Sequence, residues 1–305
     1  MALVWLVLIS VLHFSLQQPQ DRRPKLKVGY LPITCHLLLS VAMERQAFFQ
    51  QSIIPVKFTS WPDMIESLKG GELDAAFILA PIAISLMYQD VPVEIALLGH
   101  RNGTGLVVSK SESIKKVEDL ANKTLAIPIR FSMQNLALLS LLDAAHVDIE
   151  TVTRVELPPP DMPSALASHA IDGYIVGEPY ATQAELIGAG TVLKDASSIW
   201  PNFISSVVIV RKDTLKDHRS MVDRFLKGLF AQGKWIEANR IEAAQIGARF
   251  FGLDSRLIRQ VLLKKKVKYI NIFPKAEEFE QIGKKMVKYR LIDHLPSIGI
   301  YAKWQ

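Results

Sequence analysis

The chain has 305 residues, of which 49% are hydrophobic and 22% charged, with one cysteine and a formal net charge of +6. This composition excludes a mainly disordered chain, and a single cysteine excludes an internal disulfide and a cysteine-rich zinc site. Residues 256–305 hold 12 basic and four acidic side chains, so the positive charge belongs to the C-terminal end. We therefore do not expect a nucleic-acid-binding protein. The run Lys264–Lys266 with Lys268 is expected to be a solvated face, with an acidic partner or membrane headgroups as the alternative.

Residues 1–24 are predicted to form a signal peptide or N-terminal anchor followed by a spacer. Positions 2–16 are almost wholly apolar, which suits a signal peptide and falls short of the ~20 residues that span a bilayer. No basic residue precedes this run and no clear cleavage site follows it, so cleavage stays open. A buried N-terminal helix is the alternative. No later run approaches the length of a membrane span, and we expect an exported, soluble body.

Strands and helices alternate along the next part of the chain. Strands separated by helices of this length form parallel sheets with helices on their faces. Residues 220–305 are then predicted to be mostly helical, so the fold class is α/β with a helical C-terminal part. The predicted strands are 25–30, 56–59, 74–79, 124–127, 154–157 and 174–176, and the predicted helices between them are 37–49, 63–69, 133–145 and 162–168.

An internal repeat divides the body into two similar halves. Six identical residues recur at a constant spacing of 98, and this period is too long for a solenoid unit. The repeat predicts two α/β lobes, each built as strand, helix, strand, helix, strand. The matched residues are Pro62, Asp63, Met64, Leu68, Asp74 and Pro81 in the first half, and Pro160, Asp161, Met162, Leu166, Asp172 and Pro179 in the second.

Two such lobes predict a ligand cleft between them. Ligands of open parallel sheets bind outside the carboxyl ends of the strands, where helix N-termini favour an anion or another acceptor. Thr34 and Ser132 follow the first strand of their halves and are candidates to cap a helix, to face the cleft, or both. Asp161 and its repeat partner Asp63 are either helix caps or cleft residues.

Three motifs then identify a family. The chain resembles the nitrate/sulfonate/taurine/bicarbonate family of solute-binding proteins, which serve ATP-binding-cassette (ABC) importers in bacteria. The resemblance runs from about residue 25 to 239. The motifs are Gly29-Tyr-Leu-Pro32, then Gly71-Glu-Leu-Asp-Ala-Ala76 leading to Ala80-Pro81, and Ile171-Asp-Gly-Tyr-Ile-Val-Gly-Glu-Pro-Tyr180.

The resemblance implies a two-lobed type II periplasmic binding protein fold that closes around a small solute by hinge motion. On that basis lobe one comprises residues 25–110 and 206–305, and lobe two comprises residues 111–205. The strand Val207–Val210 would return the chain to lobe one. The expected partners are a small solute and the membrane permease and ATPase subunits of an importer, with a monomeric protein located outside the cytoplasm.

Several ligand-binding candidates follow from the resemblance. Trp61 matches a position that often supplies an aromatic wall, or is an ordinary core aromatic. Ala80 and Pro81 belong to the second motif, and Gly177 and Glu178 to the third, with Glu178 serving either the solute or the hinge.

Three more candidates come from their places beside the predicted strands. Arg130 and Phe131 follow the first strand of lobe two, where an arginine could neutralise an anion or lie in solvent. His36 either reaches the cleft or starts a helix. Cys35 lies in the same loop and could report on ligand without doing chemistry.

One departure from the family bears on the solute. Nitrate- and bicarbonate-type members carry a charged ligand contact shortly before the returning strand, where this chain has the uncharged run Asn202-Phe-Ile-Ser-Ser206. Nitrate and bicarbonate themselves become doubtful. A sulfonate, another small organic acid or a neutral heteroaromatic solute is equally compatible.

Enzymatic chemistry has little support in the sequence. The seven histidines show no metal-binding spacing, and phosphate-binding and nucleophile-elbow motifs are absent. We expect no metal, cofactor or catalytic residue. An enzyme on the same fold, similar to pyrimidine-synthesis proteins, is the main alternative, although one cysteine cannot supply their cysteine-rich motif. A ligand-binding sensor module is the third possibility.

Overall fold

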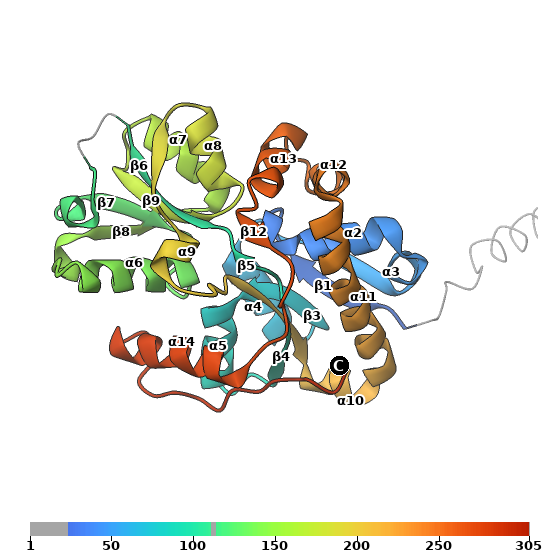
Figure 1. Ribbon diagram of the computed structural model, residues 1–305. Helices are drawn as coiled ribbons and strands as arrows, with labels where there is room; N and C mark the ends of the chain where they lie inside the picture. Colours follow the sequence, from blue (N-terminus) through green and yellow to red (C-terminus); the bar gives the residue numbers. More distant parts are fainter. Residues whose placement is uncertain (1–23, 111–113, 305) are drawn as a thin grey trace, which may run out of the picture.

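The computed structural model describes residues 24–110 and 114–304. Two five-stranded sheets form the centres of two bodies, which we call the first and second lobes (Figure 1). The expected export segment lies outside the described residues apart from Pro24. Within the described ranges, no helix is both long and apolar enough to cross a membrane.

The first sheet has the strand order β2-β1-β3-β11-β4. Strands β1, β2 and β3 are parallel, and β11 runs antiparallel to both β3 and β4. Strand β3 reads Ala-Ala-Phe-Ile-Leu and is buried throughout, as expected for a strand covered on both faces. The strands are β1 (Leu26–Tyr30), β2 (Ile53–Lys57), β3 (Ala75–Leu79), β4 (Val93–Leu98) and β11 (Ser206–Arg211).

Helices cover the first sheet and continue to the C-terminal part. In α4, the Ser60 hydroxyl accepts a hydrogen bond from the backbone N–H of Asp63, and Pro62 fits the first turn, where its missing N–H costs nothing. The elements are η1 (Thr34–His36, a 3-10 helix), α2 (Leu37–Arg45), α3 (Ala47–Ser52), α4 (Trp61–Lys69), α5 (Ala80–Tyr88), α10 (Lys212–Asp217), α11 (Arg219–Ala238), α12 (Arg240–Phe251), α13 (Ser255–Leu263) and α14 (Ala276–Lys288).

The second sheet has the strand order β10-β6-β9-β7-β8. Strands β7, β8 and β9 are parallel, whereas β6 runs antiparallel to β9 and β10. The strands are β6 (Thr104–Ser109), β7 (Thr124–Ile127), β8 (Thr153–Glu156), β9 (Gly173–Gly177) and β10 (Gly190–Asp195). The helices are α6 (Met133–Ala144), α7 (Met162–Ala167), α8 (Tyr180–Leu186) and α9 (Ala196–Ile199), with 3-10 helices η2 (Val117–Leu120), η3 (Ile149–Thr151) and η4 (Pro159–Asp161).

The two sheets have the same topology, which gives the 98-residue repeat a structural meaning. Three parallel strands, β2-β1-β3 in one lobe and β8-β7-β9 in the other, are followed by a fourth strand that runs antiparallel to them and a fifth that runs antiparallel to the fourth. The repeated aspartates have matching roles as well. Asp74 accepts a hydrogen bond from the backbone N–H of Lys27 at 2.7 Å, and Asp172 accepts one from Thr124 at 2.7 Å. Both carboxylates therefore fix the start of the first strand of their sheet.

The lobes exchange strands where the chain crosses between them. Strand β6 follows the first-lobe strands closely in sequence but pairs within the second sheet, and β11 returns to the first sheet, as expected of Val207–Val210. The expected first-lobe range of 25–110 therefore differs from the sheet membership, because residues 104–109 belong to the second sheet. Short strands β5 (Arg101–Asn102) and β12 (Val267–Lys268) pair beside this crossing.

The C-terminal part is mostly helical, as predicted, with helices α11, α12, α13 and α14. Helix α14 packs on α5, and the helical structure ends at Lys288. Residues 289–304 then cross the first lobe in an irregular path (Figure 1). The Trp304 indole N–H donates to the carbonyl of Ala96 at 3.0 Å. Pro296 and Gly299 in this segment disfavour a helix, which accounts for its irregular path.

Candidate functional site

A small cavity of about 10 Å³ lies where the two lobes meet, about the space of one water molecule. Strands β3 and β9 end at it with Leu79 and Gly177, and Pro128 directly follows β7. It thus lies at the carboxyl ends of parallel strands, the expected place for a ligand in such sheets. The first lobe and the crossing before β11 supply Ile33, Cys35, Trp61, Leu79 and Ser205, and the second lobe supplies Pro128, Gln134, Pro159, Gly177 and Glu178.

The cavity wall follows the internal repeat. Trp61 and Pro159 are 98 residues apart and both line it, and the same holds for Leu79 and Gly177. Equivalent positions of the two halves therefore face each other across the seam between the lobes.

Two buried polar atoms in the cavity wall have no hydrogen-bond partner among the described residues: the Trp61 indole nitrogen and the Gln134 amide oxygen. Trp61 is 3% exposed and Gln134 is 1% exposed. The amide nitrogen of Gln134 donates to the hydroxyls of Thr104 and Ser205, each at 3.0 Å. These two hydroxyls hold the amide group, and two residues that line the cavity thus each retain one unpaired polar atom, a donor on Trp61 and an acceptor on Gln134.

Cys35 contributes a thiol to the cavity wall. Burial raises the pKa of this thiol to about 12, and a hydrogen bond with Ser205 lowers it only in part. The thiol therefore stays protonated near neutral pH and is a poor nucleophile. This environment suits a residue that packs against a solute.

His36 lies behind the wall, with its ring edge-on to Trp61 at 6.1 Å between centroids. Its Nδ1 lies 2.8 Å from the backbone nitrogen of Leu31, which donates to it. Burial lowers the pKa of His36 to about 3 and that of His100 to about 4. Both imidazoles are therefore neutral and supply no positive charge to the seam.

Thr34 joins the two lobes directly. Its hydroxyl donates to the backbone carbonyl of Glu178 at 2.5 Å, and its own carbonyl accepts from the Tyr269 hydroxyl at 2.7 Å. Thr34 is fully buried. Thr34 was a candidate to cap a helix or to face the cleft, and its hydroxyl contacts protein across the seam.

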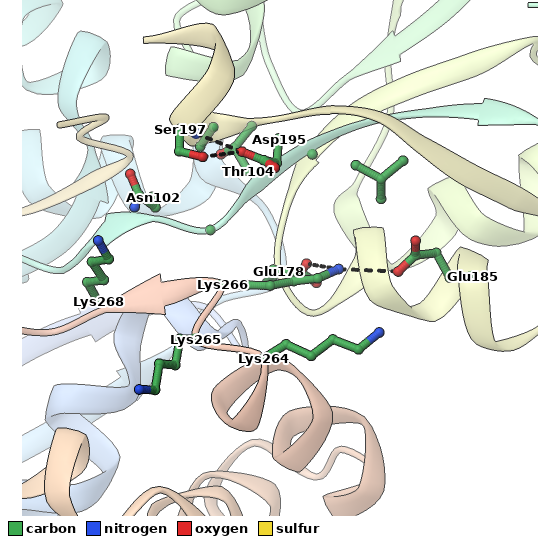
Figure 2. A pocket seen from close by; sticks show the side chains of 14 residues that line it. Asn102, Thr104, Glu178, Glu185, Asp195, Ser197, Lys264, Lys265, Lys266 and Lys268 are labelled. Carbon is green, nitrogen blue, oxygen red and sulfur yellow. Dashed lines mark hydrogen bonds and ion pairs between the residues drawn. The ribbon is translucent and has the colours of Figure 1, made fainter. Parts of the chain in front are cut away.

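The carboxylate of Glu178 is bound by side chains beside the cavity. It accepts hydrogen bonds from the backbone N–H and the hydroxyl of Thr182, both at 3.0 Å. The Lys266 ammonium lies 3.0 Å from it and 3.3 Å from Glu185 (Figure 2). It also donates to the Thr182 hydroxyl at 2.9 Å. We call Lys266, Glu178, Thr182 and Glu185 the Lys266 clasp. Burial lowers the pKa of Lys266, but the two glutamates outweigh burial and raise it overall.

The clasp borders a second pocket of about 450 Å³ between the lobes (Figure 2). One side carries the run Lys264–Lys266 and Lys268, and the other carries Asn102–Gly105 with Asp195 and Ser197. Lys264, Lys265 and Lys268 are exposed. The pocket therefore combines charges of both signs, and the lysine run lies at the junction of the lobes.

Arg130 and Phe131 lie away from the cavity. Arg130 is exposed, its guanidinium donates to the carbonyl of Arg290 at 3.1 Å, and it lies over the Phe131 ring at 5.7 Å. It lines a separate pocket of about 260 Å³ beside the end of α14. The structure thus gives no support to its predicted contact with an anion in the cleft.

The other candidates do not line the cavity. Ser132 caps α6 by accepting from the Asn135 N–H at 3.1 Å. Ala80 and Pro81 begin α5 behind Leu79, where the Ala80 N–H donates to the carbonyl of Ser205. Asp161 is exposed at the start of α7. The structure thus brings together Thr34, Trp61, Gly177 and Glu178, and separates Arg130, Phe131 and Asp161 from them.

Two functional candidates were not found in the sequence: Gln134 and Ser205. Gln134 lies 98 residues after the candidate His36, so the repeat spacing could have pointed to it. An isolated glutamine in a helix otherwise has no distinctive pattern. Ser205 lies in the uncharged run before β11. Within the described ranges, no group of three or more His, Cys, Asp or Glu residues could hold a metal ion.

Comparisons with known proteins place this chain in a family. Residues 19–249 match the NMT1-like family. The chain is 30% identical over 225 residues to a bicarbonate transport ATP-binding protein, CmpC, of Synechocystis sp., covering 67% of this chain and 34% of that protein. It is 30% identical over 174 residues to the taurine-binding periplasmic protein of Escherichia coli, covering 56% and 53%.

A solved structure shares the fold. The periplasmic nitrate-binding protein NrtA from Synechocystis superposes with a TM-score of 0.82 at 16% identity, covering 89% of this chain and 83% of that one. The chain spans about a third of the length of the curated relatives it matches first. The α/β architecture of two similar lobes is that of type II periplasmic binding proteins. The chain belongs to the NMT1-like family.

Proposed function

We propose that this protein is the solute-binding component of an ABC importer and captures a small solute in the cavity between its lobes. The observation that carries the proposal is the cavity itself, which lies at the carboxyl ends of strands from both sheets and receives side chains from both lobes. Solute-binding proteins of nitrate, sulfonate and taurine importers are its homologues and structural neighbours.

The partners and the location follow from this role. We propose that the protein works outside the cytoplasm and delivers its solute to a permease driven by an ATPase, because the taurine-binding and nitrate-binding relatives are described as periplasmic. Residues 1–24 would then direct export. The lysine run beside the lobe junction is well placed to contact an acidic surface of such a partner.

A binding role fits the chemistry of the cavity better than catalysis does. The lining residues include one thiol, whose raised pKa keeps it protonated, and one carboxylate, which is engaged by Lys266 and Thr182. A general base or nucleophile needs an accessible group with a suitable pKa. We therefore propose that the protein is not an enzyme.

A thermal-shift screen of purified, ligand-stripped protein tests the proposal. Nitrate, bicarbonate, taurine, alkanesulfonates, small carboxylates and small neutral amides would each be added at millimolar concentration. A solute that binds only the folded protein raises stability by about 2.7 kcal/mol at a hundredfold excess over Kd. At least one solute should raise the melting temperature without being consumed. Turnover of a solute, or no shift with any of them, contradicts the proposal.

A further inference from the structure

The cavity wall indicates which chemical class of solute it accepts. We propose that the solute is electrically neutral, accepts a hydrogen bond from the Trp61 indole and donates one to the Gln134 amide oxygen. The inference rests on the proposed solute-binding function and names the ligand class of the same site.

The first argument is the charge of the wall. Of the ten lining residues that the structure describes, none is Lys, Arg or His. Glu178 is the one charged member, and its carboxylate is bound by Lys266 and by Thr182. Lys266 in turn contacts two carboxylates, so it has no surplus charge to offer a solute. An anion entering this cavity would lose its hydration without gaining a cation.

The second argument concerns the helix N-termini, which could hold an anion without a cation. Four helices that begin near the cavity, α4, α5, α6 and α8, each have one N–H group of the first turn bound by the chain itself. The Ser60 hydroxyl caps α4, and the Ser132 hydroxyl caps α6. At α5, the Ala80 N–H bonds to Ser205, and Pro81 has no N–H.

The remaining helix of this set, α8, already carries a negative charge at its N-terminus. Glu178 accepts from the backbone N–H of Thr182 in its first turn. A resident carboxylate there uses the favourable end of the helix dipole and repels a second anion. These four helix ends therefore favour an anionic solute less than uncapped ends would.

The third argument is the unpaired donor and acceptor. Leaving a buried polar group without a partner is costly, and such groups mark the places where a ligand is expected to bind. The Trp61 N–H can only donate, and the Gln134 oxygen can only accept. A carboxylate, nitrate or sulfonate would accept the hydrogen bond from the Trp61 N–H but would be repelled by the Gln134 amide oxygen. An amide, a lactam or a ring with adjacent N–H and C=O groups satisfies both.

The rest of the wall suits apolar faces of such a molecule. Ile33, Leu79, Pro128 and Pro159 line the cavity together with the Trp61 ring. At about 10 Å³ the cavity holds less than such a solute needs, so the lobes must separate for entry and the wall must widen on binding. We base the charge of the solute on the residues that line the cavity when the lobes are in contact.

Matched pairs of neutral and anionic compounds test the inference. Methanesulfonamide would be compared with methanesulfonate, acetamide with acetate, and nicotinamide with nicotinate, each by thermal shift and calorimetry. The neutral member of at least one pair should bind at least tenfold more tightly than its anion. Its Kd should stay constant between 50 mM and 500 mM salt, because no charge pairing is involved.

Two variants test the hydrogen bonds. Trp61→Phe keeps an aromatic ring without the N–H, and Gln134→Leu removes the acceptor. Each should weaken the neutral compound by about two- to tenfold, the range expected for one hydrogen bond. Trp200→Phe and Gln183→Leu, at half-buried positions outside the cavity, serve as controls and should leave the Kd unchanged.

The outcomes separate the inference from the proposed function. Tighter binding of the anion in every pair, or of nitrate or taurine over all neutral compounds, overturns the neutral-solute inference and leaves solute binding intact. Neutral binding that neither variant weakens also overturns it. If none of the pairs and none of the relatives' solutes binds, the solute-binding proposal itself fails.

Discussion

His36 and His100 are buried near the junction of the lobes without charge. Burial lowers the pKa of His36 to about 3 and that of His100 to about 4, compared with about 6.5 for an exposed histidine. Between these values the unfolded chain binds protons that the folded chain excludes. The free energy of unfolding is therefore unaffected by these two histidines above about pH 6.5. Below that pH it decreases, because protonation favours the unfolded chain.

We expect acid to destabilise the fold through these two residues. Between pH 7 and pH 5, each should remove about 2 kcal/mol from the free energy of unfolding. Urea unfolding at both pH values measures the loss, and His100→Gln should reduce it by about 2 kcal/mol. His146→Asn, at an exposed position with a positive φ that asparagine tolerates, is the control. An equal loss in wild type and His100→Gln would show that His100 does not contribute.

Individual site residues were predictable where a motif or the repeat fixed their place. Gly177 was a candidate from a motif and Trp61 from a matching family position, and both line the cavity. Arg130 was placed beside the right strand, but a long side chain can turn either way from one backbone position. It turns toward Arg290, a residue 160 positions away whose neighbourhood no local pattern reveals. Gln134 acquires its importance only from contacts with Thr104 and Ser205.

At the level of elements, the Lys266 clasp connects the segment between α13 and β12 with α8 of the second lobe. Its central carboxylate, Glu178, is 2% exposed, whereas the Lys266 side chain is 25% exposed. Removing one member of a buried ion pair leaves the other charge without compensation, which costs more than the pair contributes. The clasp should therefore stabilise the arrangement in which the lobes are in contact.

Lys266→Met should lower the free energy of unfolding by about 2–3 kcal/mol, because the buried Glu178 carboxylate loses its positively charged partner. Adding Glu178→Gln to this variant should restore part of the loss, since the amide carries no charge. Chemical denaturation measures both. Lys264→Met, an exposed neighbour in the same run, is the control and should change stability by less than about 0.5 kcal/mol. A Lys266→Met variant as stable as this control would contradict the importance of the clasp.

The crossing between the lobes requires a glycine at position 103. Gly103 has a φ of 74°, and a Cβ there would lie 2.8 Å from the Val267 side chain. Gly188 has a φ of 76° with nothing within 4 Å, so it isolates the backbone cost from the crowding. Gly103→Ala should destabilise by more than Gly188→Ala, for which about 1–2 kcal/mol is expected from the positive φ alone. If thermal unfolding shows the same loss of stability in both variants, a packing role for Gly103 is contradicted.

Most elements could be predicted from hydrophobic patterning together with the repeat. Strands β1, β3, β7 and β9 lie close to their predicted positions, because each is a short apolar run bounded by breaking residues. The exchange of β6 and β11 between the sheets could only partly be predicted. Strand β6 is as apolar as a first-lobe strand, and its partners β9 and β10 lie 64 or more residues further along the chain. Pairing over such separations leaves no local signal.

On the scale of the whole molecule, two sheets of one topology enclose a cavity whose wall combines equivalent positions of the two halves. The C-terminal lysine run lies beside the junction and outside that cavity. Capture of the solute is thus separated in space from the charged surface proposed for docking. The motifs and the repeat predicted the two lobes, whereas the uncharged character of the cavity depends on where side chains from both lobes meet.

The single cysteine gives the most direct test of where the solute binds. Cys35 lines the cavity and is 2% exposed. It is the single cysteine of the chain, so thiol alkylation reports on this residue alone. Its alkylation should be slow in the folded protein and fast in denaturant. The solute with the largest thermal shift should slow alkylation further, in proportion to the fraction of protein bound. A solute that binds with a measurable Kd but leaves the alkylation rate of Cys35 unchanged would contradict binding between the lobes.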